Sequence, residues 1–221
     1  NQSSERAVLN WAEFNVDGGN TVNFNQPGKG SLALNKIFQG DPSRIFGSVN
    51  ANGQIYLINQ NGILFGKGSQ VNVGALIASS LAIDPDAESG GILNPTLLRQ
   101  DKPAFSGDGR VYVVDADGQV VTGPDGQPIP VKVVVEEGAK ISSSAAGGGS
   151  IALLGQDVEN AGQVESPSGQ VILAAGQKVY LQASESPDLR GLLVEVDAGG
   201  TAWNKATGQI ASTLGNVSVV G

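Results

Sequence analysis

Carboxylates are the side chains of this sequence with the clearest capacity for chemistry. The motif Asp115-Ala116-Asp117-Gly118 resembles the start of a calcium-binding loop, in which acidic side chains supply oxygen ligands. The glutamate that such a loop needs at its twelfth position is replaced here by Gly126. Because Asp-Gly is also a strong signal for a tight hairpin turn, we interpret the motif as a turn and expect no metal site.

The remaining acids do not form a recognisable catalytic pattern. Glu136 and Glu137 follow an apolar run and precede Gly138, which is typical of a solvated turn. Polysaccharide-cleaving enzymes place two carboxylates across a sugar, but the acids of this chain are scattered over turns without a fixed spacing. The chain has no histidine and no cysteine, which removes the Ser-His-Asp triad, thiol nucleophiles and most zinc sites. We therefore expect no catalytic residues, no cofactor and no enzymatic activity.

Charge and hydropathy limit the partners. The chain has 21 acidic against 13 basic residues, whereas nucleic acids and anionic membranes select a basic surface. No run of about 18 apolar residues is present. Since no basic and apolar segment stands at Asn1, we expect that any signal peptide has been removed or left out of this sequence. The absence of cysteine suits a chain that crosses an oxidising periplasm unfolded, although drift in composition would give the same count.

A short repeat indicates the fold class. The triplet Gly-Gln-Val/Ile places a glycine at a corner before a strand with inward apolar residues. Similar strands begin at Ile151 and Val171, 20 residues apart. A period just above 20 residues with two or three short strands is typical of one coil of a parallel β-helix. The fixed leucine frame of leucine-rich repeats and the regular hairpins of a β-sandwich are missing. The triplets begin at Gly53, Gly118, Gly162, Gly169 and Gly208.

We predict an all-β, right-handed parallel β-helix in a single domain, residues 1–221. Coils are expected over about 10–80 and 139–221, with residues 192–196 and 216–220 continuing the series. Roughly seven coils at ~4.8 Å each would form a stack about 35 Å long. The inward-facing residues are expected to include Ile55, Leu57, Ile63, Val71, Ile151, Leu153, Val171, Leu173, Leu193 and Val217.

The repeat breaks between residues 84 and 137. This stretch holds ten acidic and four basic residues, so it is more acidic than the rest of the chain. Asn94 and Pro95 predict the cap and first residue of a short helix. Apolar runs separated by polar turns over residues 110–135 predict an antiparallel sheet. We expect the whole stretch to lie outside the coil stack as an acidic excursion.

Several segments, in a fixed order, carry a resemblance to a known family. The strongest is the run from Ile45 to Gly66, and residues 7–16, 22–37, 71–79, 149–155 and 172–176 also fit. Together they resemble the haemagglutination-activity, or two-partner-secretion (TPS), domain of filamentous-haemagglutinin-like exoproteins. The sequence looks most similar to the high-molecular-weight adhesin subtype. Members of this family usually carry capping strands upstream of the position of Asn1, so we expect either that this sequence is truncated or that another segment supplies the cap.

The resemblance implies a function in export from a Gram-negative bacterium. It implies an N-terminal secretion-signal domain of a large adhesin-like exoprotein. A cognate outer-membrane β-barrel transporter would capture the extended chain in the periplasm through its POTRA repeats, for instance by strand addition. The domain would then nucleate β-helix folding at the cell surface. We expect a secreted monomer without a nucleic-acid partner, whose full-length protein contacts host cells.

The candidate residues for export are Asn35, Asn59, Gln60, Asn61 and Gly62, which lie in the segment most like the family signature. Gln60 stands where the family usually has proline. Because glutamine can adopt the φ that proline presets, we expect the turn to survive. The residues would matter either because the transporter reads them or because they shape a corner turn. Asn and Gly have a sufficient local role at corners, which favours the second explanation.

Two other functions stay open. A self-sufficient adhesin module would bind host glycan or protein through the acidic excursion, and glycan binding by the folded domain would support it. A β-helical polysaccharide-active enzyme is the other alternative, against which the scattered acids and the missing histidine weigh.

Overall fold

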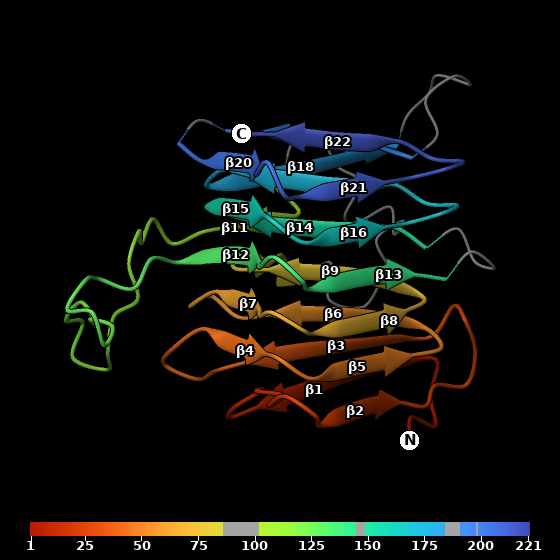
Figure 1. The fold of residues 1–221 in the computed structure, drawn as a ribbon, viewed down its shortest axis with the longest axis horizontal. Helices are drawn as coiled ribbons and strands as arrows, with labels where there is room; N and C mark the ends of the chain where they lie inside the picture. Colours follow the sequence, from red (N-terminus) through yellow and green to blue (C-terminus); the bar gives the residue numbers. More distant parts are fainter. Residues whose placement is uncertain (86–101, 145–148, 184–190, 198) are drawn as a thin grey trace.

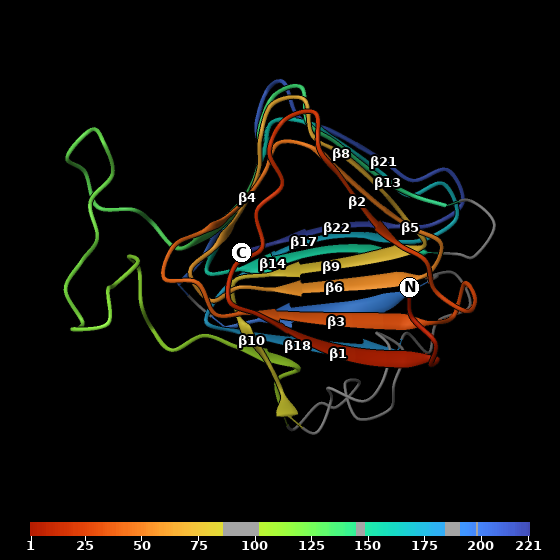
Figure 2. The same cartoon turned by 90° about the horizontal axis from the view of Figure 1, so that it is seen from below.

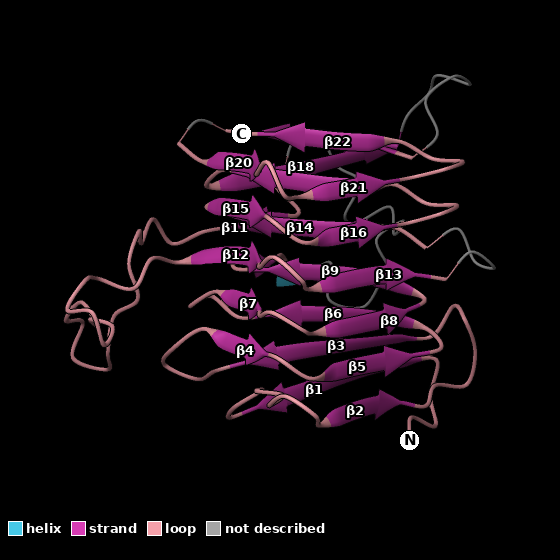
Figure 3. Cartoon of the chain, viewed as in Figure 1, coloured by secondary structure: helices cyan, strands magenta, loops and turns pink. Residues whose placement is uncertain are grey.

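A computed structural model describes residues 1–85, 102–144, 149–183, 191–197 and 199–221. The chain winds into a stack of coils, and each coil passes through three parallel sheets, which we name A, B and C (Figures 1 and 2). Strands make up the stack (Figure 3), so the predicted all-β parallel β-helix is confirmed. Within the described residues, no helix has the length and apolarity that a membrane crossing requires.

Sheet A contains one strand from every coil. Its order is β1 (Arg6–Trp11), β3 (Leu32–Ile37), β6 (Gln54–Ile58), β9 (Ala75–Ser79), β14 (Ile151–Gly155), β17 (Val171–Ala175) and β22 (Val217–Val220). Sheet B consists of β4 (Ser43–Ile45), β7 (Ile63–Phe65), β12 (Lys132–Val135), β15 (Asp157–Asn160) and β20 (Thr201–Asn204). Sheet C consists of β2 (Thr21–Phe24), β5 (Ser48–Ala51), β8 (Gln70–Val73), β13 (Lys140–Ser143), β16 (Gln163–Glu165) and β21 (Gln209–Ala211).

The core inside the coils is built from aligned apolar rows. Parallel pairing in register places Ile55 beside Ala33 and Leu76, and Val171 beside Ile151. Equivalent side chains therefore lie above one another in neighbouring coils. Eight predicted inward residues are buried in this inner core, which confirms their orientation: Ile55, Leu57, Ile63, Val71, Ile151, Leu153, Val171 and Leu173.

A fourth sheet, D, is antiparallel and lies outside the coils. It consists of β10 (Ala82–Ile83), β11 (Phe105–Ser106), β18 (Lys178–Ala183) and β19 (Leu192–Val196), in that order. The chain leaves the coil after β9 to form β10 and β11, and again after β17 to form β18 and β19. In Figure 2, β10 and β18 lie beyond sheet A, on the side away from sheets B and C.

Sheet A is consequently buried on both faces. Leu34, Tyr56 and Ile77 point away from the inner core, yet each is at most 1% exposed. They pack in a second, outer core with Phe105 and Leu181 of sheet D. Since burying one large apolar side chain contributes about 1.5–3 kcal/mol, the outer core adds on the order of 10 kcal/mol or more.

Several predicted boundaries were wrong. The strand at residues 132–135 was expected in the excursion, but it pairs in parallel with β7 and β15 inside the stack. The strand at residues 192–196 was expected to continue the coils, but it pairs antiparallel with β18. Leu193 on that strand is accordingly 45% exposed. Val217 keeps the register of Val171 but is 46% exposed. Its strand, β22, is the edge strand of sheet A and has a neighbouring coil on one side only.

The antiparallel arrangement expected after residue 110 is confirmed for residues 111–131. Bridges join Tyr112 to Pro130 and Val114 to Val120, and the segment stands off the stack at the left of Figure 1. The helix expected at residues 94–95 falls outside the described residues. The assignment of residues 1–221 to one domain stays a prediction.

A column of glycines marks the corner between sheets C and A. A Cβ atom on Gly74 would lie 2.6 Å from the carbonyl oxygen of Gly53, and the same oxygen accepts the Gly74 N–H at 2.8 Å. A Cβ atom on Gly149, Gly169 or Gly215 would likewise overlap the carbonyl oxygen of the glycine one coil earlier. The backbones therefore approach too closely at this corner for any side chain.

Replacement of Gly74 by alanine should destabilise the domain by about 2–4 kcal/mol, because the rigid backbone of Gly53 cannot move aside without breaking the stack. The measurement is the free energy of unfolding from urea denaturation. Gly30→Ala is the control, since a Cβ atom there meets nothing within 4 Å. Equal effects of the two substitutions would contradict the close approach.

Candidate recognition and folding site

The segment Asn59 to Gly62 forms a corner turn between β6 of sheet A and β7 of sheet B. The Gly62 N–H donates to the Asn59 carbonyl oxygen at 2.9 Å, and the Asn61 N–H donates to Asn59 Oδ1 at 2.9 Å. No described residue other than glycine has a positive φ, and Gly62 itself has φ 106°. These features match a type I turn with Asn first and Gly fourth. The turn therefore forms with Gln60 in the place of proline, as expected, and Gln60 is exposed.

Hydrogen bonds tie this turn to the preceding coil. Asn59 is fully buried, and its Nδ2 donates to the Asp41 carbonyl oxygen at 3.2 Å and to Ser43 Oγ at 3.0 Å. Asn61 Nδ2 donates to the Gln39 carbonyl oxygen at 2.7 Å. Because these bonds cross from one coil to another, both asparagines hold the two coils at a fixed distance at this corner.

The next coil and the excursion contact the same turn. A Cβ atom on Gly62 would lie 2.8 Å from the carbonyl oxygen of Lys132, so the backbone of β12 packs directly on this glycine. Arg110 Nη1 donates to Asn61 Oδ1 at 3.2 Å, while Arg110 Nε forms an ion pair with Asp108 at 2.6 Å. The turn thus contacts the preceding coil, the following coil and the excursion.

The neighbouring corner repeats the use of amide side chains. Gln39 is buried; its Oε1 accepts from the Phe14 N–H at 2.8 Å, and its Nε2 donates to the Pro42 carbonyl oxygen at 2.9 Å. Asn15 Oδ1 accepts from the Arg44 N–H at 2.9 Å. Sequence reasoning missed Gln39, although the register of β3 on β6 aligns it with Asn61, so aligning the coils would have found it. Arg110 gave no such signal, because the excursion has no repeat.

Asn35 lies apart from the turn, inside the inner core. Its Oδ1 accepts from Trp11 Nε1 at 2.9 Å, and its Nδ2 donates to the carbonyl oxygens of Ala33 and Tyr56 at 3.1 Å each. These bonds join β1, β3 and β6, and the Trp11 ring packs edge-on against Phe14 at 5.3 Å between centroids. Asn35 is therefore a polar link between the first coils. The structure does not bring it together with Asn59, Asn61 and Gly62.

The two acidic motifs that could have carried chemistry are engaged by backbone. Asp115 Oδ1 accepts from the N–H groups of Asp117 and Gln119 at 3.0 and 2.8 Å, which confirms the predicted turn. Glu136 Oε2 accepts from the Lys67 N–H at 2.9 Å and so fastens two coils at a corner. In the part of the chain that the structure describes, no group of three or more His, Cys, Asp or Glu could hold a metal ion.

Three charged side chains meet on the outer face of sheet B. Glu159 lies between Lys132 and Lys205, with O–N distances of 2.9 and 2.6 Å. Burial acts to raise the pKa of Glu159, but the hydrogen bonds and charges of the two lysines outweigh it and hold the pKa below its ordinary value. Lys205 Nζ also lies 5.2 Å from the ring centroid of the exposed Trp203.

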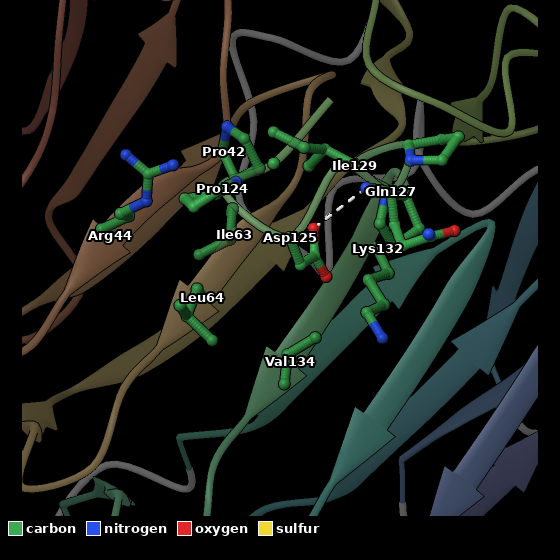
Figure 4. Close-up of a pocket in the computed structure, with 13 residues that line it drawn as sticks. Pro42, Arg44, Ile63, Leu64, Pro124, Asp125, Gln127, Ile129, Lys132 and Val134 are labelled. Carbon is green, nitrogen blue, oxygen red and sulfur yellow. Dashed lines mark hydrogen bonds between the residues drawn. The ribbon is translucent and has the colours of Figure 1, made fainter. Parts of the chain in front are cut away.

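Beside this cluster, a cavity of about 490 Å³ lies between sheet B and the turn of the excursion (Figure 4). Its walls are mainly aliphatic, and Pro42, Leu64, Ile129 and Val134 are among them. Its two basic residues already have partners: Arg44 pairs with Asp41 at 2.9 Å, and Lys132 pairs with Glu159. The Asp125 carboxylate accepts from the Gln127 N–H at 3.1 Å. The charges at the cavity thus serve the protein's own packing.

Comparison with known proteins agrees with this geometry. A family model described as "TPS secretion domain" matches residues 1–219. Two curated relatives are heme/hemopexin-binding proteins of Haemophilus influenzae. One, from strain KW20/Rd, is 28% identical over 84% of this chain and 18% of its own length. The other is 31% identical over 46% of this chain and 11% of its own length. The chain thus spans less than a fifth of either relative.

A solved structure shares the fold. The secretion domain of HMW1 from Haemophilus influenzae superimposes with a TM-score of 0.60. The match is 22% identical in sequence and covers 94% of this chain and 46% of that one. At this identity the likeness concerns the β-helical fold.

Replacement of Asn59 by alanine should lower the free energy of unfolding by about 1–3 kcal/mol, because the buried acceptors at Asp41 and Ser43 lose their donor. Gln60→Ala, at the exposed position of the same turn, should stay within about 0.5 kcal/mol. Urea denaturation of both variants makes the comparison. If Asn59→Ala were as stable as Gln60→Ala, the link between coils would contribute nothing.

The lowered pKa of Glu159 predicts a pH dependence. The folded state favours the ionised carboxylate, so its stabilisation is present above the ordinary pKa of 4.5 and is lost as the pH falls through the lowered value. Glu159→Gln should therefore reduce the loss of stability on acidification below pH 4.5, by at most about 1 kcal/mol because the pair is partly solvated. Urea midpoints of both proteins across this range test the prediction. Parallel curves would show that the lysines do not favour ionised Glu159.

Proposed function

The chain belongs to the family of TPS secretion domains, and from this premise we propose how the fold serves export. As a member of this family, it is the secretion domain of a large exoprotein of a Gram-negative bacterium. The exoprotein passes through the periplasm and leaves the cell through a cognate outer-membrane transporter. The family is one of secretion domains and not of enzymes. The match over residues 1–219 is the observation that carries this function.

We propose that the transporter captures the domain in an extended form through periplasmic POTRA repeats. The strands of sheet A support this order of events, since both of their faces are buried in the folded stack and only the extended chain can offer them to a partner. Extended Val- and Ile-rich segments can add as strands to an exposed sheet edge. Folding at the cell surface then prevents the chain from sliding back through the transporter. The domain acts as a monomer and catalyses no reaction.

We propose further that the signature residues act in export mainly through the folded corner. Asn59 and Asn61 support this with three hydrogen bonds to the preceding coil. What the remainder of the exoprotein binds is a separate proposal, which includes contact with host cells. Because two relatives are heme/hemopexin-binding proteins, haem and hemopexin are the first ligands to test on the full-length protein.

The double substitution Asn59→Ala and Asn61→Ala should reduce secretion through the cognate transporter together with the thermal stability of the purified domain. The expected loss of stability follows from the three lost bonds between coils. Secretion is measured as the amount of exoprotein in the medium, with Gln60→Ala as the matched control in the same turn.

The two readouts separate the mechanisms. Lost secretion with unchanged stability would mean that the transporter reads these asparagines directly, against our proposal. Normal secretion by a clearly destabilised domain would show that folding outside does not drive export.

A further inference from the structure

The early coils depend on residues that come much later in the chain. Leu32, Leu34, Tyr56, Ile58 and Ile77 form the outer face of sheet A on β3, β6 and β9, and each is at most 5% exposed. Among the described residues, the side chains that cover them lie on β10, β11, β18 and β19, together with Leu81 and Ala104 beside these strands. Without sheet D, this face of the early coils would lose that cover and present an apolar surface to water.

The first half of the cover is too small to stand alone. The strands β10 and β11 have two residues each and pair through two residue pairs. A hairpin of this size is not stable in water without further strands. The central strand β18 pairs with β11 on one side and with β19 on the other. The described strands of sheet D are therefore joined into one sheet only when β18 is in place.

The same late strands are fastened to the last coils. Gln170, the residue before β17, donates from Nε2 to the Leu192 carbonyl oxygen at 2.9 Å and accepts from the Leu192 N–H at 2.7 Å. Its Nε2 also lies 2.9 Å from Ser218 Oγ, next to β17 in β22. The segment that closes the early coils is thus locked by the final ones.

We propose that the domain commits to its folded state only when β18 and β19, together the closing segment, dock on sheet A. The coils then do not add one by one as stable units, and the first coils stay reversible until the closing segment arrives. The inference rests on the fold alone. One consequence rests on the proposed function. During export, folding would prevent the chain from sliding back only after about residue 196 has reached the cell surface.

Pulsed hydrogen exchange during refolding of the purified full chain tests the proposal. Amides of β3 and β6 should acquire protection with the same rate constant as amides of β18. A faster, separate phase for β3 and β6 would show that early coils are stable without the closing segment and would overturn the proposal. No transporter takes part, so a negative result leaves the function in export intact.

Leu181→Ala supplies a second test, because Leu181 is fully buried in the closing segment. It should slow the protection of β3 and β6 severalfold, although these strands lie more than a hundred residues earlier. The control is Leu214→Ala, the same change at a side chain that is 61% exposed, which should leave the rate unchanged. Slower protection of β18 and β19 with unchanged β3 and β6 would overturn the proposal. If Leu181→Ala does not fold, the proposal is decided by the rate constants at which β3, β6 and β18 acquire protection in the unmodified chain.

Discussion

The double burial of sheet A is the constraint on which the rest of the structure depends. A parallel sheet inside a solenoid normally has one face in the core and one in water, and its outward residues can be polar. Here both faces are apolar, so the sheet must be covered on the outside as well as filled on the inside. The two departures of the chain from the coil, after β9 and after β17, supply that cover as sheet D.

The sequence predicted those parts of the fold that depend on local pattern. Continuous apolar strands such as residues 151–154 and 171–174 indicated buried parallel strands, and they are central strands of sheet A. The pattern could not distinguish a coil strand from a covering strand. Residues 192–196 and 132–135 are both short and apolar, and what decides between sheet D and sheet B is the partner, which the local sequence does not contain.

The candidate site was predictable to a similar extent. Asn59, Asn61 and Gly62 carry the residue types of a corner turn, and the structure places them in one. Asn35 looked alike in sequence but lies in the inner core, because its partner Trp11 is set by the register of β1 on β3. The contact of Arg110 with Asn61 joins segments 49 residues apart, and the excursion that carries Arg110 has no repeat from which to predict it. Their role in export stays a prediction that the hydrogen bonds support.

A repeat fold gains stability from neighbouring coils, whereas the outer cover links coils that are far apart in the chain. The stack and sheet D should therefore unfold as one cooperative unit. Differential scanning calorimetry of the purified domain tests this most directly. We expect a single transition whose calorimetric and van't Hoff enthalpies agree. Two resolved transitions, or a calorimetric enthalpy well above the van't Hoff value, would show that the coils are stable without their cover.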